Sequence, residues 1–186
     1  MSAIAAQPDT TGPASALRRL YFARFAFAIV WAVVMLAVAD HLDPLVDTLL
    51  VLYPLFDAAA AVYDARSSSS GSSPRLLYVN TAVSAITAVG VAIACASGIP
   101  AVLRVWGAWA VVAGLVQLIV AVPRRAMGGQ WPMILSGAIS VLAGASFIAA
   151  AGGDDPSLSH PAGYAVPGGI FFLISAVRLG RAGKRA

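Results

Sequence analysis

The sequence predicts an all-α membrane protein with six transmembrane helices arranged as three repeated helical hairpins. Hydrophobic residues make up 60% of the 186 residues, charged residues make up 11%, and the mean hydropathy is +0.85. In an ordinary globular domain about a quarter of the residues are charged. The apolar residues also gather into runs of about 20, the length that crosses roughly 30 Å of hydrocarbon. A third observation is an aromatic and small-residue pattern that recurs along the chain.

Six apolar runs follow one another, and they cover residues 20–39, 45–63, 76–96, 102–122, 131–151 and about 162–179. The short connections between them divide the chain into a polar N-terminal tail (1–19), hairpin 1 (20–66), a serine-rich linker (67–75), hairpin 2 (76–125), hairpin 3 (126–179) and a basic C-terminal tail (180–186). The lipid bilayer is therefore the main predicted partner. Little chain remains for a catalytic domain outside it.

The distribution of Lys and Arg predicts the orientation. In a six-span arrangement eleven of the twelve lie on one side, and only Arg104 lies on the other. Because cytoplasmic flanks retain positive charge, both termini are predicted to be cytoplasmic. The net charge of +4 is thus a topology signal, and no nucleic-acid partner is expected.

A cleaved secretory signal is the alternative interpretation of the first apolar run. Basic residues precede it, and the small residues at 37–39 resemble a cleavage site. The run is long for a signal, however, and its removal would leave an unpaired span. We therefore interpret 20–39 as the first transmembrane helix.

The second helices of the three hairpins share a pattern. They align on Tyr53, Trp109 and Tyr164, which are 56 and 55 residues apart. A small residue follows the aromatic in each (Ala58, Gly114, Gly169), and an arginine closes each helix (Arg66, Arg124, Arg178). The first helices match less well, with Val34, Gly90 and Gly144 at related places. Self-similarity of this kind predicts an architecture built from repeats.

Small residues also recur at four-residue intervals within single spans. The third span carries Asn80, Ser84, Ala88, Ala92 and Ala96, and the fifth carries Ser136, Ser140 and Gly144. Membrane helices associate through close backbone approach at such residues. The stripes predict a tight bundle, and they are equally compatible with a homo-oligomer formed through small-residue helix faces.

The chain resembles the HdeD family of small bacterial membrane proteins, whose repeated hairpin is domain of unknown function 308. The resemblance rests on "LYPLFDAAAAVYDAR", "WGAWAVVAGLVQLIVAV", "GQWPMILSGAISVLAGASFI" and "YAVPGGIFFLISAVRLGR", and it covers nearly all of the chain after residue 20. It implies a six-helix protein of the bacterial inner membrane, associated with acid resistance and without an established enzyme activity. The acidic residue often expected near the middle of the fifth span is Ser136 here.

Asp57 is the principal candidate for a functional residue, because it lies inside an apolar run. Ionisable residues within spans usually face the bundle interior, where they form pairs or mark ion and proton pathways. Arg24 lies at a similar depth in the first span and is the predicted partner in a structural pair. The alternatives are a proton-handling or ligand-binding role and a partly hydrated carboxylate. The other hairpins carry Ala113 and Gly168 at this position, which favours a specific partner over a requirement of the fold.

The remaining candidates are polar residues that lie within the apolar runs and two histidines outside them. Gln117 and Asn80 are predicted to form interhelical hydrogen bonds. His41 and His160 share the outer side with several aspartates and are interpreted first as solvated loop residues. The alternatives are pH sensing and, less in keeping with their spacing, metal binding. Cys95, the only cysteine, is predicted to be a small buried residue.

No catalytic residues, metal ligands or cofactors are predicted, because no nucleophile, phosphate-loop or cofactor motif is present. The resemblance implies an HdeD-like function, related to acid stress or to the structure of the membrane. The alternative is a small proton-coupled transporter or channel subunit that uses Asp57. A polar cavity reaching Asp57 would favour transport, and a dry bundle with Asp57 bonded to Arg24 would favour the structural role.

Overall fold

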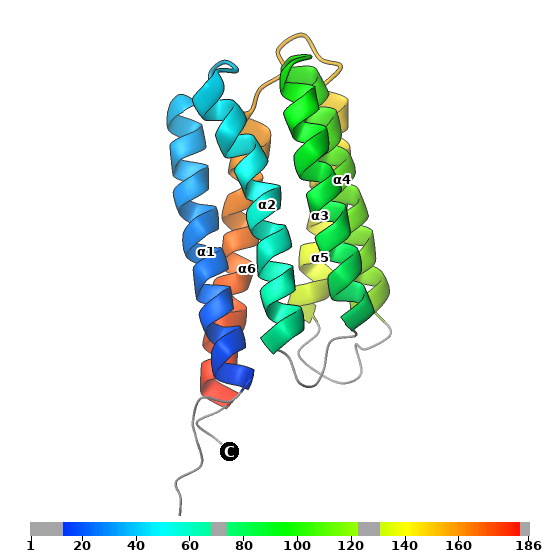
Figure 1. Cartoon of the computed structure of the whole chain (residues 1–186). Coiled ribbons are helices and arrows are strands. Elements are labelled where there is room, and N and C mark those ends of the chain that lie inside the picture. The colour runs from blue at the N-terminus through cyan, green and yellow to red at the C-terminus, as the bar shows by residue number, and fades with distance from the viewer. Residues whose placement is uncertain (1–12, 68–73, 123–130, 183–186) are drawn as a thin grey trace, which may run out of the picture.

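The computed structural model describes residues 13–67, 74–122 and 131–182, and within these ranges it is entirely helical (Figure 1). Its six helices are α1 (Pro13–Val38), α2 (Pro44–Ser67), α3 (Pro74–Cys95), α4 (Ile99–Ala121), α5 (Trp131–Ala150) and α6 (Ser159–Ala182). They run up and down along one bundle axis, so that α1 begins and α6 ends at the same end of the bundle (Figure 1). The predicted all-helical fold and the number of helices are confirmed for the described residues.

The first helix begins earlier than the apolar run predicts. Residues 1–19 were expected to form a polar tail, but α1 is helical from Pro13. The apolar run marks only the hydrocarbon crossing, while the helix continues through charged residues that the headgroup region can solvate. Proline at the first position also suits a helix start. Similarly, α6 extends to Ala182, into the predicted C-terminal tail. Most of the serine-rich linker, together with Arg124, Arg125, Lys184 and Arg185, lies outside the described residues.

Local chemistry explains where two helices start. Asp43 precedes α2, and its Oδ1 accepts a hydrogen bond from the Val46 amide at 2.8 Å, which is the usual role of a helix N-cap. Gly98 precedes α4 with φ of 95°, a backbone conformation that favours glycine. These turns allow consecutive helices to reverse direction at the end of the bundle where α1 joins α2.

The most extensive helix contacts join different hairpins instead of the two helices within one hairpin. Helix α4 packs most extensively on α5, α1 on α6, and α2 on α3. The contacts of α3 with α4, α1 with α2, and α5 with α6 are smaller. Glycines allow the close approach of α4 and α5 at the first of these helix–helix interfaces, which are called seams below. A Cβ on Gly107 would lie 2.6 Å from the Gly144 carbonyl oxygen, and a Cβ on Gly114 would lie 2.6 Å from the Gly137 carbonyl oxygen.

The small-residue stripe of α3 is a packing surface over only part of its length. Ser84 and Ala88 are buried, whereas Ala92 and Ala96 are exposed. Residues at four-residue intervals drift by about 40° per step around a helix with 3.6 residues per turn. Over the whole stripe this drift carries the later alanines out of the seam.

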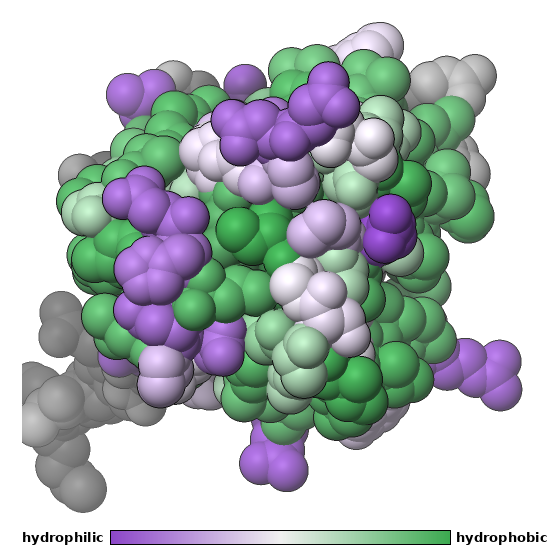
Figure 2. Space-filling view, turned by 90° about the horizontal axis from the view of Figure 1, so that it is seen from above, coloured by the Kyte–Doolittle hydropathy of each residue, from purple (hydrophilic) through white to green (hydrophobic). Residues whose placement is uncertain are grey.

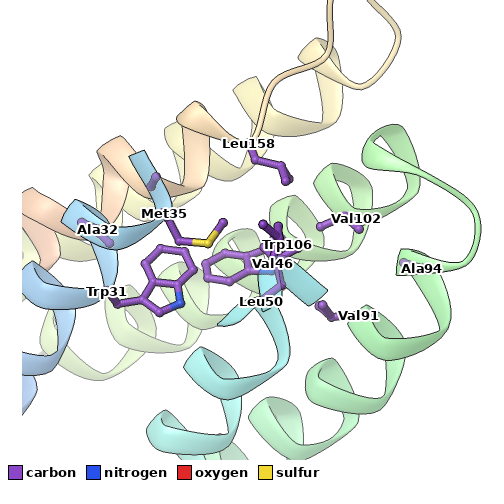
Figure 3. Close-up of a cluster of buried hydrophobic side chains, with 12 residues drawn as sticks. Trp31, Ala32, Met35, Val46, Leu50, Val91, Ala94, Val102, Trp106 and Leu158 are labelled. Carbon is purple, nitrogen blue, oxygen red and sulfur yellow. The ribbon is translucent and has the colours of Figure 1, made fainter. Parts of the chain in front are cut away.

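The hydrophobic core lies toward the end of the bundle where α1 joins α2. Trp31 and Trp106 stack at its centre, with ring centroids 5.4 Å apart, and buried aliphatic side chains surround them (Figure 3). The Trp31 indole also donates a hydrogen bond to the Leu49 carbonyl oxygen at 2.7 Å, which ties α1 to α2. Seen from this end, hydrophilic residues gather in patches on the end face, with hydrophobic residues along much of the perimeter (Figure 2).

Five of the described helices are long and apolar enough to cross a membrane, and α5 contributes a shorter apolar stretch, Ile134–Ala150. Many large apolar side chains on these helices are exposed, among them Ile86, Ile119 and Leu142. A soluble protein rarely exposes so continuous an apolar surface. The fold is therefore that of a multi-pass membrane protein surrounded by lipid.

Candidate functional site

Asp57 is the centre of a polar cluster that joins α1, α2 and α3. The Arg24 guanidinium on α1 forms an ion pair and hydrogen bond through Nη2 with Asp57 Oδ1. On α3, Asn80 Nδ2 donates to Asp57 Oδ2 at 2.9 Å, and Ser84 Oγ donates to the same oxygen at 2.7 Å. These four residues are called the polar cluster below. The carboxylate thus has three donors, which offset the cost of removing its charge from water.

The sequence explains how the cluster forms. Asn80 and Ser84 are one helical turn apart and therefore present their polar groups on the same side of α3. Arg24 and Asp57 lie at matching depths in the antiparallel helices α1 and α2, so the predicted pair is present. Their side chains are only 14% and 21% exposed, as expected for a pair held within the bundle.

Arg24 also connects the polar cluster to α6. Its guanidinium carbon lies 4.7 Å from the centroid of the Phe172 ring, within the range of a cation–π interaction. Sequence reasoning did not assign Phe172 to the site, and it placed Ser84 only in a packing stripe. The four-residue spacing of Ser84 from Asn80 was the signal that could have identified this second donor.

Aromatic rings lie between the polar cluster and the hydrophobic core. Phe27 stacks on Phe56 with centroids 3.8 Å apart, and Trp31 meets Tyr53 edge to face at 4.6 Å. Tyr53 also contacts Trp109, at 6.1 Å. Along α1 and α2 these residues occupy the turns next to Arg24 and Asp57. Phe27, Tyr53 and Trp109 also pack against the hydrophobic core.

The structure places Gln117 at a different seam. A Cβ on Gly137 of α5 would lie 3.4 Å from the Gln117 Cβ, so Gln117 belongs to the contact between α4 and α5. A separate polar contact lies between α5 and α6, where the hydroxyls of Ser140 and Tyr164 are 2.5 Å apart. Of the predicted intramembrane candidates, the structure brings together Arg24, Asp57 and Asn80.

The two histidines lie at the opposite end of the bundle and have local partners. His41 Nε2 is 3.8 Å from Asp43 Oδ2, and His160 Nδ1 is 3.0 Å from the Ser157 carbonyl oxygen. Both histidines are exposed. Within the described ranges, no group of three or more His, Cys, Asp or Glu residues could hold a metal ion. The pH-sensing role of the histidines stays a prediction.

The fold and the site together define an α-helical, multi-pass membrane protein with a buried ion pair. Comparisons of the chain with protein-family models, with curated proteins and with solved structures find no match. The functional argument therefore depends on the geometry of the site itself.

Proposed function

We propose that the chain is an HdeD-like protein of the bacterial inner membrane with a structural or stress-related role and no catalytic activity. The observation that carries the proposal is the bonding of Asp57. Three donors from two neighbouring helices occupy its carboxylate oxygens. A carboxylate bonded in this way fixes helices relative to one another. A carboxylate that serves as a proton carrier needs a path along which the proton arrives and leaves.

The proposal includes six membrane spans with both termini in the cytoplasm. Five helices meet the length and composition of a span, and α5 becomes the sixth when the 20 residues Trp131–Ala150 are counted as a whole. The positive-inside rule supports the orientation. Arg18 lies near the start of α1, Arg66 in the last turn of α2 and Arg178 near the end of α6. These three helix ends lie at the same end of the bundle (Figure 1).

We also propose that the three hairpins are repeats. The packing supports this, because residues 28, 84 and 140, which are 56 positions apart, each lie on the first helix of a hairpin and contact the second helix of another hairpin. These contacts are Ala28 with Gly169, Ser84 with Asp57, and Ser140 with Gly114. In two of the three, the partner is the small residue of the aligned second helix, and Asp57 lies directly before the third, Ala58.

A double-mutant cycle on the Arg24–Asp57 pair tests the structural role. Breaking a buried ion pair from one side costs about 3–5 kcal/mol, and we expect the lower end of that range because both side chains keep some exposure. Arg24→Gln, Asp57→Asn and the double variant are to be compared by SDS titration in detergent. The double variant should lose much less than the sum of the single losses. Asp154→Asn, at an exposed aspartate, is the control.

Acid survival distinguishes the structural role from the alternative, a small proton-coupled transporter or channel subunit. A strain without the protein is complemented with wild type or with Asp57→Asn. Under the structural proposal, the variant is less stable in detergent, and survival follows only the amount of folded protein. Full stability of Asp57→Asn combined with lost acid survival would contradict the proposal and favour proton transfer through Asp57.

A further inference from the structure

A groove lies between α2 and α3, away from the polar cluster and near the end of the bundle where α1 joins α2. Its volume is about 350 Å³, which is within the size range of small-molecule sites. Asp47, Val51, Leu52 and Leu55 line it from α2, and Ala92 and Cys95 line it from α3. It is called the α2–α3 groove below.

The α2–α3 groove opens toward the lipid. Leu52 and Leu55 are 42% and 47% exposed, and both belong to a helix that is apolar enough to span the membrane. Ala92 on the opposite wall is also exposed. An aliphatic chain from the surrounding leaflet can therefore enter from the side.

Asp47, at the end of the groove, is half-buried and has no cationic partner among the described residues. Its Oδ1 is buried and has no hydrogen-bond partner, and no Lys or Arg of the described ranges forms an ion pair with it. The neighbouring Thr48 hydroxyl donates to the Pro44 carbonyl oxygen at 2.6 Å. The Cys95 thiol is close enough to the carboxylate to form a hydrogen bond with it, but a thiol is only a weak donor. A carboxylate oxygen that is shielded from water and has no strong donor is unfavourable, so this end of the groove is suited to a cationic donor.

The position of Asp47 in the first turn of α2 does not explain this burial. An acidic side chain near a helix N-terminus is favourable, but that interaction needs no contact with α3. Asp43 already accepts a hydrogen bond from the Val46 amide at this helix end. The carboxylate of Asp47 instead lies over a groove whose other walls are apolar.

We propose that the α2–α3 groove binds an aminophospholipid of the surrounding leaflet, with its ammonium group on Asp47 and an acyl chain along Leu52 and Leu55. Asp47 lies near the end of its span, at the depth of lipid headgroups. Leu55 is eight residues further along α2, or about 12 Å at 1.5 Å per residue, toward the bilayer centre. The carboxylate thus lies at the depth of the lipid's ammonium group, and the apolar lining lies at the depth of its acyl chain. This inference is independent of the role proposed for Asp57.

Native mass spectrometry of the full chain, purified in detergent, tests the proposal. Phosphatidylethanolamine and phosphatidylglycerol with the same acyl chains are added in turn, because they differ in the ammonium group. We expect phosphatidylethanolamine to bind more tightly, and Asp47→Asn to weaken it about tenfold, the effect of losing one charge-assisted hydrogen bond. Asp155→Asn, at an exposed aspartate of the same bundle end, should leave binding unchanged.

Ala92→Phe provides a second variant, which fills the groove without removing the charge. Because Ala92 is exposed, the larger side chain should leave the fold intact while reducing retention of phosphatidylethanolamine. Equal retention of the two lipids by wild type, or unchanged retention by Asp47→Asn, would overturn the proposal. Asp47-dependent binding of dodecylammonium but not of phosphatidylethanolamine would overturn the lipid as the ligand and assign the site to a water-borne amphiphile. Thermal unfolding of each variant confirms that folded proteins are compared.

Discussion

Replacing Gly144 with alanine should destabilise the bundle by about 2 kcal/mol. The added Cβ would lie 2.4 Å from the Gly107 carbonyl oxygen and 2.8 Å from the Val111 amide nitrogen. Both are backbone atoms of α4, so relief requires the two helices to move apart. Overpacking costs up to about 3 kcal/mol, and the better helix propensity of alanine returns up to about 1 kcal/mol. The free energy of unfolding is measured by SDS titration in detergent.

Gly168→Ala is the matched control for this prediction. Gly168 is also within a helix, but nothing lies within 4 Å of the position that a Cβ would take. Only the propensity gain then applies, and the variant should equal or exceed wild type in stability by up to about 1 kcal/mol. If both glycine variants shift the unfolding free energy by the same amount, close approach of α4 and α5 does not stabilise the bundle.

Three further predictions concern single contacts, and SDS titration measures each. Asp43→Ala removes the N-cap of α2 and should cost about 1 kcal/mol, whereas Asp43→Asn should retain most of the stability. Tyr164→Phe removes the hydroxyl contact with Ser140 at 2.5 Å and should cost about 0.6 kcal/mol, the average for interhelical hydrogen bonds in a membrane protein. Met35→Ala truncates a side chain that is 1% exposed and should cost about 2–5 kcal/mol. Combined with Asp57→Asn it should be additive within about 0.5 kcal/mol, because Met35 lies about three helical turns from the polar cluster.

The sequence was sufficient to predict the helices and the central ion pair. Apolar runs of the right length locate the helices because the hydrocarbon core has a fixed thickness. The pairing of Arg24 with Asp57 followed from depth alone, since two antiparallel neighbours place residues at equal distances from one membrane face side by side. The starts of the helices were less predictable, as α1 shows, because a helix does not end where the hydrocarbon does.

The sequence was not sufficient to predict which helices pack most extensively. The hairpin division leaves open which helices pack on one another, and the three most extensive contacts, α4 with α5, α1 with α6 and α2 with α3, all join helices of different hairpins. Glycine can serve any seam, so its presence at 107 and 144 does not identify the partner helix. The same ambiguity affects Asp47. Its position in the first turn of a helix suggests an interaction with that helix end, and only the packing of α3 against α2 reveals the groove.

The three most extensive helix–helix interfaces, or seams, are held together by different interactions. This difference accounts for the position of Asp57. Between lipid-facing helices there is no hydrophobic driving force, so a seam needs close backbone contact or polar bonds. The seam of α4 with α5 has glycines on both helices. In the seam of α1 with α6, a Cβ added to Gly169 would lie 3.3 Å from the Ala28 Cβ. The seam of α2 with α3 has no facing glycine pair among the described residues, and Asp57 bonds across it to Asn80 and Ser84. In this seam the carboxylate takes the place of the close approach that glycine allows in the other two. The hydrogen bonds of Asp57 hold α2 and α3 together only at the depth of the polar cluster. The α2–α3 groove lies at a different depth, nearer the end of the bundle where α1 joins α2.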